Sequence, residues 1–241
     1  MPITADLLAI FAHPDDAELL AGGTLIKAVD QGYRVAAVDL TRGELGSRGT
    51  PEIRAREAAA SAEVMGLVAR ENLGLPDGHL ASTDAMRRTV IEAIRRFRPR
   101  TVITHYTVGR HADHRIAAEL VRDACFLSGL LNYPAEGAKH RPVKLLHSMS
   151  YREDAAEPRF IVDTTGQLER KLAAMRCFES QWDIETLQGG ELHPTGQSLF
   201  DLVRTQDAHI GSRIRAAYGE PFWTLEAVEV ADVVTMGVAS L

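Results

Sequence analysis

Short apolar runs alternate with longer amphipathic stretches through the first 130 residues of the chain. The first run, residues 7–12, is apolar throughout and stops at the polar sequence HPDD, a pattern that predicts a buried strand with polar residues at its carboxyl end. Apolar positions then recur at helical spacing until Gly32, a residue type that commonly ends helices. We therefore expect a strand followed by a helix over residues 16–31.

The same order of strand and helix repeats as far as residue 130. Helices of this length between short strands indicate βαβ units, which build a parallel sheet with helices on both faces. We therefore predict an α/β fold, a Rossmann-like domain of three layers with a mostly parallel sheet. Its further strands are predicted at residues 34–40, 72–75 and 101–105, and its further helices at residues 51–65, 83–97 and 112–130.

The pattern loosens after residue 133, where the sequence YPAEGAKHRP indicates a surface loop. No linker or internal repeat follows, so we expect one domain over residues 1–241 with extra C-terminal strands and helices. These strands are predicted at residues 145–151, 159–162 and 225–230, and the helices at residues 167–178 and 197–218.

Charge and cysteine content exclude several classes of function. The formal net charge of −6 argues against a nucleic-acid binder, which needs a clustered surplus of basic residues. Two cysteines cannot assemble a disulfide framework or a cysteine zinc site. The N-terminal apolar run is too short for a signal sequence or a membrane span. We expect a soluble, cytoplasmic protein that binds neither nucleic acid nor membrane.

Polar residues gather where three predicted strands end, at residues 13–16, 41–54 and 105–114. In open α/β sheets, ligands bind outside the carboxyl ends of the strands. The carboxyl edge of the sheet is therefore the expected place of the functional site.

Two of these segments contain histidine and aspartate at the spacing of metal ligands. His13 and Asp16 lie three residues apart across a predicted turn, and His111 and His114 have the same spacing on one face of a predicted helix. A catalytic zinc takes about three such ligands and leaves one position to water. Either motif alone is explained as well by a helix N-cap, but the two together favour a metal site.

Two more aspartates belong to the same motifs. Asp15 can turn toward a water molecule at the metal and act as a general base, and Asp113 can orient the ring of His111. Gly22 and Gly23 lack the spacing of a dinucleotide-binding loop and indicate close packing of the first helix against the sheet. We expect surface or hydrogen-bonded positions for the other histidines: His79, His105, His140, His147, His193 and His209.

The sequence AHPDDAELLAGGTL and the later HADH resemble the PIG-L/LmbE-like deacetylases, which carry an AHPDD motif and a distal HxDH motif. The segments DLTRGELGSRGTPEIRAREA and ENLGLPDG are similar to the bacillithiol-pathway branch of that family, the N-acetylglucosaminyl-L-malate deacetylases. The resemblance covers residues 5–130, with YGEPF at residues 218–222 adding to it. It implies a metal-dependent amidohydrolase that removes the acetyl group from an N-acetylglucosamine conjugate.

The same resemblance implies a role for each motif residue. Asp15 is the general base, and His111 stabilises the tetrahedral oxyanion and acts as general acid with Asp113 as its partner. Arg54 faces the sugar. The ligands that the resemblance implies for Zn²⁺ are His13, Asp16 and His114.

The chain departs from this branch in one loop. Where the branch has the string Asp-Arg-His-Pro-Asp-His, residues 109–114 read GRHADH, which leaves the ligands in place but gives a less rigid loop. The departure bears on the substrate rather than on the metal. Arg54 and Arg110 are suited to an anionic aglycone such as malate because guanidinium groups bind carboxylates in a bidentate way, although either can belong to an ion pair of the fold.

Two other functions stay open on the sequence alone. One is deacetylation of another N-acetylglucosaminide, of the chitobiose type or linked to inositol. The other is a non-catalytic sugar-binding module, in which a structural zinc would have four ligands and no need of a spare carboxylate such as Asp15. The resemblance also implies a small-molecule amino-sugar substrate and a homo-oligomer such as a hexamer, and it leaves zinc and iron as alternatives.

Overall fold

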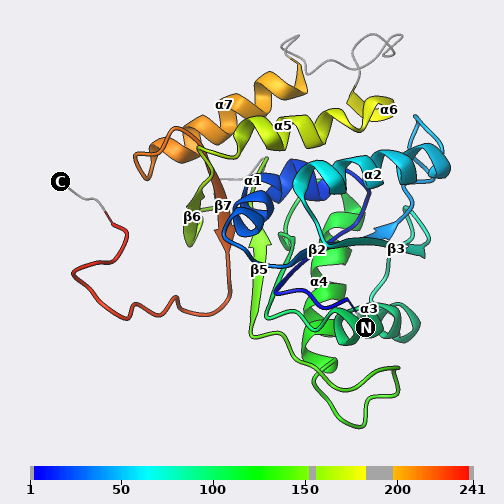
Figure 1. Cartoon of the computed structure of the whole chain (residues 1–241). Coiled ribbons are helices and arrows are strands. Elements are labelled where there is room, and N and C mark those ends of the chain that lie inside the picture. Colours follow the sequence, from blue (N-terminus) through cyan, green and yellow to red (C-terminus); the bar gives the residue numbers. More distant parts are fainter. Residues whose placement is uncertain (1–2, 152–155, 183–197, 239–241) are drawn as a thin grey trace.

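A computed structural model of the chain describes residues 3–151, 156–182 and 198–238 (Figure 1). Within these residues one sheet has the strand order β3-β2-β1-β4-β5-β7-β6. The pairs from β3 to β5 are parallel, and β7 is antiparallel to both of its neighbours. The predicted α/β fold is confirmed. The strands are β1 (Leu7–Phe11), β2 (Val35–Thr41), β3 (Ala69–Leu75), β4 (Thr101–His105), β5 (Lys144–Ser148), β6 (Phe160–Asp163) and β7 (Gly219–Trp223).

Helices cover both faces of this sheet (Figure 1). Alternate side chains of β1 point to opposite faces, as strand geometry requires: Leu8 and Ile10 pack with α3 and α4, whereas Ala9 and Phe11 pack with α1. α5 lies against α1 and α2, and α7 packs outside it. The helices are α1 (Asp16–Asp30), α2 (Pro51–Met65), α3 (Asp84–Phe97), α4 (Ala112–Leu127), α5 (Leu168–Arg176), α6 (Glu179–Trp182) and α7 (Leu199–Ser212).

The C-terminal part corrects one prediction. The last strand of the described residues is β7, not residues 225–230, which form neither strand nor helix. Gly219 and Pro221 both disfavour a strand, so local sequence hides β7, yet β7 is held between β5 and β6. The alternation at residues 225–230 has no neighbouring strand to pack against, and Leu225 is 70% exposed.

A smaller correction concerns β3, which begins at Ala69 instead of residue 72. Charged residues mask the start of this strand, because Arg70 lies in it and pairs with the buried carboxylates of Glu18 and Asp39. Elsewhere the predicted α5 ends earlier, at Arg176. In the part of the chain that the structure describes, no helix is long and apolar enough to cross a bilayer.

The order of the strands determines where the site lies. The chain leaves β1 toward β2 on one side and returns to β4 on the other, so β1 and β4 are parallel neighbours whose carboxyl ends diverge into different helices. Such a point of divergence opens a crevice at the sheet edge. The loops that follow β1 and β4 contain residues 13–16 and 105–114, the two predicted motifs.

Candidate metal centre and active-site cavity

The turn after β1 is fixed by its own backbone. The amide of His13 donates a hydrogen bond of 2.8 Å to Oδ2 of Asp16, and Asp15 adopts a left-handed conformation with φ of 112°. A non-glycine residue keeps such a conformation only where its surroundings impose it. Asp15 occupies the N-cap position of α1 without a side-chain cap bond, so helix capping does not explain the HPDD sequence.

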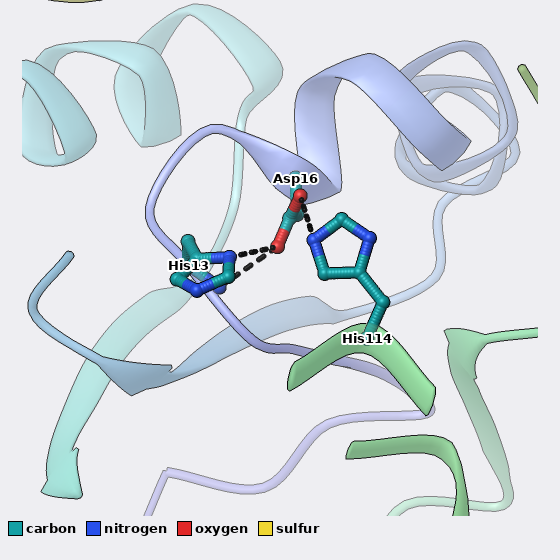
Figure 2. A group of neighbouring side chains, drawn as sticks. All are labelled: His13, Asp16 and His114. Carbon is teal, nitrogen blue, oxygen red and sulfur yellow. Dashed lines mark hydrogen bonds and ion pairs between the residues drawn. The ribbon is translucent and has the colours of Figure 1, made fainter. Parts of the chain in front are cut away.

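Three side chains converge beside this turn (Figure 2). The carboxylate of Asp16 lies between two imidazoles: Oδ2 is 3.2 Å from Nδ1 of His13, and Oδ1 is 3.2 Å from Nε2 of His114. Ligand atoms of these residues lie within 4.8 Å of one another. Two imidazole nitrogens and one carboxylate form the donor set of a catalytic zinc site with a position left for water.

The second ring nitrogen of His13 faces two further carboxylates. Its Nε2 lies 3.1 Å from Oδ1 of Asp77 and 3.5 Å from Oδ2 of Asp113. Backbone amides hold both acids, because Leu45 donates to Asp77 at 2.9 Å and Gly78 donates to Asp113 at 2.7 Å. A carboxylate on the far nitrogen is the usual means of orienting a metal-binding histidine.

Asp77 lies in the candidate site, and the sequence did not single it out. It belongs to the segment ENLGLPDG, and that family resemblance was the only signal of its role. Asp113 was expected beside His111, whereas its carboxylate lies against His13 and accepts the hydrogen bond from the amide of Gly78. The partnership between Asp113 and His111 therefore stays a prediction.

The electrostatics of this cluster favour a cation. Burial lowers the pKa of His13, but the carboxylates of Asp16, Asp77 and Asp15 outweigh it and raise that pKa to about 9. Burial alone would raise the pKa of Asp16, yet the neighbouring His114 and His105 hold it well below the ordinary value. Buried carboxylates that draw a proton onto imidazole equally attract a metal ion, so the residues present fit a divalent cation.

Asp15 differs from its neighbour Asp16 in the direction of its pKa shift. Burial and the adjacent charge of Asp16 raise the pKa of Asp15 well above its ordinary value, and the positive charges of Arg54 and His13 oppose the rise. A carboxylate is an efficient general base when its pKa approaches the working pH. The two adjacent aspartates are thus suited to different tasks.

The end of β4 and the start of α4 bring two more imidazoles, those of His105 and His111, to the ring of His114. His105 is buried, its Nε2 accepts a 2.9 Å hydrogen bond from the amide of Ala12, and its ring stacks on His114 with a centroid distance of 4.0 Å. Burial and the nearby His114 lower the pKa of His105 to about 3. His105 was predicted only as a surface or hydrogen-bonded histidine, and it also orients a candidate ligand.

His111 stands at the mouth of this arrangement. It is exposed, occupies the N-cap position of α4 without a side-chain cap bond, and stacks on His114 at 4.5 Å. The stacking confirms that the two histidines share one face. Partial burial, followed by the proximity of His114 and His13, lowers the pKa of His111.

A cavity of about 540 Å³ opens next to the imidazoles. Arg110 lines it, and a contact between Arg110 and the substrate stays a prediction. Arg54 does not line it: this side chain is 6% exposed, packs against Gly43 and bonds to Gln181. A contact between Arg54 and the sugar stays a prediction. The other lining residues include Leu19, Tyr106, His105, His111, His114 and Tyr151.

The remaining histidines agree with the prediction where they are described. His79, His140 and His147 each bond to a backbone carbonyl, and His209 is exposed. His193 lies outside the described residues.

Comparison with known proteins identifies relatives of this chain. The family described as PIG-L: GlcNAc-PI de-N-acetylase matches residues 8–125. A diacetylchitobiose deacetylase from Thermococcus kodakarensis is 31% identical over 189 residues, covering 73% of this chain and 70% of that protein. A probable N-acetyl-alpha-D-glucosaminyl L-malate deacetylase 2 from Bacillus cereus is 28% identical over 190 residues, covering 73% and 83%.

A solved structure extends the likeness over nearly the whole chain. The conserved protein TT1542 from Thermus thermophilus superposes with a TM-score of 0.82 and 34% sequence identity, covering 95% of this chain and 98% of that one. The likeness therefore includes β6 and β7 as well as the motif-bearing half.

Proposed function

The chain belongs to the PIG-L family of deacetylases, hydrolases that act on amide bonds, and from that premise we propose that it is a zinc-dependent deacetylase of N-acetylglucosaminyl-L-malate. Deacetylases of this family depend on a metal. The two curated relatives named above act on small amino-sugar conjugates. The observation that carries the proposal is the carboxylate of Asp16 held between His13 and His114.

These three residues would hold the ion. A bound Zn²⁺ supplies a Lewis acid for the amide carbonyl and lowers the pKa of a water molecule from about 15.7 toward about 7. Two side chains, Asp15 and His111, would transfer the protons of the reaction. Asp15 takes a proton from the attacking water, since burial has raised its pKa toward that task.

His111 serves the other half of the reaction. Protonated, it hydrogen-bonds the oxyanion formed when water adds to the carbonyl, and it then gives its proton to the departing amine as the C–N bond breaks. The products are acetate and a free amino sugar. Its exposed place at the cavity supports this role, because the leaving group must reach solvent.

The choice of malate as aglycone depends on the loop after β4. Arg110 is exposed on the cavity lining, where a guanidinium can pair with a carboxylate of the substrate. Because the sheet continues from β3 to β6, we also propose that residues 1–241 form one domain. Assembly into a homo-oligomer remains part of the proposal.

The test is a panel of N-acetylglucosaminides offered to metal-loaded protein, with and without a malyl group, while released acetate and amine are measured. We expect the malyl conjugate to have the highest kcat/KM. Equal rates on chitobiose-type or inositol-linked substrates would remove malate from the proposal. One bound metal per chain with no amide hydrolysis of any substrate would instead support the non-catalytic sugar-binding module.

A further inference from the structure

A buried charged cluster lies in the C-terminal half, outside the candidate metal centre. Lys171 of α5 is fully buried, and its Nζ lies 2.8 Å from Oδ2 of Asp207 on α7 and 2.8 Å from Oε1 of Glu220 on β7. We name these three residues the Lys171 cluster. Taking such charges out of water is costly, so a buried ion pair is weak evidence for stability and invites a search for another role.

One end of the Lys171 cluster holds the middle of α1. The backbone amides of Gly23 and Thr24 donate to the carboxylate of Glu220 at 2.9 and 2.7 Å. A Cβ on Gly22 would lie 3.1 Å from Cγ of Lys171, and one on Gly23 would lie 2.8 Å from Thr164. Gly23 thus permits the predicted close packing of α1 against the sheet, whereas Gly22 faces Lys171 of α5. Glu220 of the YGEPF segment contributes to this packing through its two hydrogen bonds.

Helix α1, which Glu220 contacts, also contributes residues to the candidate site. α1 begins at Asp16, and its residues Leu19 and Leu20 line the cavity. The carbonyl of Leu20 accepts hydrogen bonds from the hydroxyls of Ser148 and Ser150, which lie at the carboxyl end of β5. Side chains from β5 and β7 therefore fix the first turns of α1 through its backbone.

The other end of the Lys171 cluster reaches Tyr151. The Tyr151 hydroxyl lies 3.3 Å from Oδ1 of Asp207, and Nζ of Lys171 lies 5.7 Å from the centroid of its ring. Tyr151 has a φ of 56°, an uncommon conformation for an aromatic residue that persists only where neighbours impose it. Burial raises the pKa of Tyr151, so its hydroxyl stays protonated and can donate to Asp207.

Tyr151 also lines the candidate active-site cavity together with His111 and His114. We propose that Tyr151 is a positioning residue for the substrate, presenting its ring to a sugar ring, and that the Lys171 cluster fixes its orientation relative to α1. The inference rests on the proposed function, because it places the amino sugar in this cavity. Ligand cavities combine aromatic surface with a few placed polar groups, and the C–H face of a pyranose fits such a ring.

The first test compares Tyr151→Ala with Tyr151→Phe. Losing the ring should raise KM about three- to tenfold, the size of one aromatic contact, while kcat and metal content stay near wild type. Tyr151→Phe keeps the ring and all charges, so its KM should rise less. An unchanged KM in Tyr151→Ala, or a metal content that falls with activity, would overturn the proposal.

A second test asks whether the Lys171 cluster acts through Tyr151. Asp207→Asn should raise KM in the wild-type background and have no further effect in a Tyr151→Ala background, whereas independent sites give additive changes. The control is Glu169→Gln, which breaks the exposed Arg204–Glu169 pair between the same two helices and should leave KM unchanged. Additive changes would contradict the coupling.

Failure of the proposed function and failure of the Tyr151 inference give different experimental results. Wild-type protein that holds metal but hydrolyses no acetamido sugar contradicts the proposed function itself. If the wild-type protein is active and the Tyr151 variants have the same KM as wild type, only this inference is contradicted. If Asp207→Asn does not fold, the comparison of Tyr151→Ala with Tyr151→Phe still decides the role of the ring.

Discussion

The loops that follow β1 and β4 lie side by side at one edge of the sheet, yet they differ in almost every physical respect. The turn at residues 12–16 is mostly buried, contains a left-handed Asp15 and is held by the hydrogen bond from the amide of His13 to the carboxylate of Asp16. The loop at residues 106–111 exposes four consecutive residues to solvent, from position 108 onward. The buried turn suits fixed ligands and a base, and the exposed loop suits contact with a variable substrate.

Because of this difference, we expect substitutions in the two loops to change different kinetic parameters. Changes in the buried turn should alter metal binding and kcat, because they move groups that act on the reacting amide. Changes in the exposed loop ahead of His111 should alter KM, because they remove contacts made equally in the ground state and in the transition state, whereas a change of His111 itself should alter kcat. The largest effects are therefore expected in the buried turn.

Substitutions of the two aspartates of the buried turn should have different effects on metal content and kcat. Asp15→Asn should keep its metal while kcat falls about 10²–10⁴-fold, the range for losing a general base, since an amide cannot accept the proton. Asp16→Ala should lose metal affinity and regain part of its activity at high zinc. Metal content and kcat, measured across a zinc titration, check both results.

The reverse pattern would exchange the two roles. If Asp15→Asn loses the metal while Asp16→Asn keeps metal and turnover, the assignment within the pair is inverted. If both variants keep zinc and full turnover, the chemistry lies elsewhere in the molecule.

The carboxylate behind His13 should have a smaller effect. Asp77→Asn should weaken metal affinity about 10–100-fold, because an amide orients the imidazole less firmly and lowers its basicity. Competition with a chelator of known affinity measures the change. Asp84→Asn, at an exposed position of α3, is the matched control, and it should bind metal like wild type. Equal affinities in the two variants would show that Asp77 does not support His13.

Sequence could predict the two motifs because their signals are local. His13 and Asp16 follow an apolar strand at a spacing of three residues, and His111 and His114 begin an amphipathic helix at the same spacing. The division into a mostly parallel sheet with helices on both faces followed from the same periodicity. These signals need no knowledge of distant contacts.

Other residues needed the register of the sheet. Asp77 meets His13 across 64 positions of sequence, and His105 bonds to Ala12 across 93. Neither partner has a ligand spacing that reveals it. Strand β7 was missed for a related reason, because pairing with β5 and β6 overrides the poor strand propensity of Gly219 and Pro221.

The exposed loop should act on KM. Arg110→Ala should raise KM for an anionic glycoside about ten- to a hundredfold, equivalent to about 1.5–3 kcal/mol, and leave KM for N-acetylglucosamine almost unchanged. Steady-state kinetics on both substrates measure the difference. Arg88→Ala, on the exposed face of α3, is the control and should change neither value. Equal losses on both substrates would mean that Arg110 does not contact the aglycone.

The smallest effect concerns the rigidity of the exposed loop. Ala112 is the first residue of α4, and His111 before it has an extended conformation with ψ of 127°. Both positions suit proline, which is favoured at the first helical residue and restricts its predecessor to extended conformations. Ala112→Pro should therefore stabilise the protein by about 0.4–1 kcal/mol, mainly by restricting the unfolded chain.

In a protein of this size, that gain corresponds to a rise in Tm of about 1–4 °C. Thermal unfolding measures it, and Ala118→Pro inside α4 is the contrasting variant, since it should lower Tm by removing a helical hydrogen bond. Because the buried turn is unchanged, metal content and kcat should match wild type in Ala112→Pro. A fall in kcat with unchanged KM would show that the substitution displaces His111, and that the rigidity of this loop also affects the chemical step.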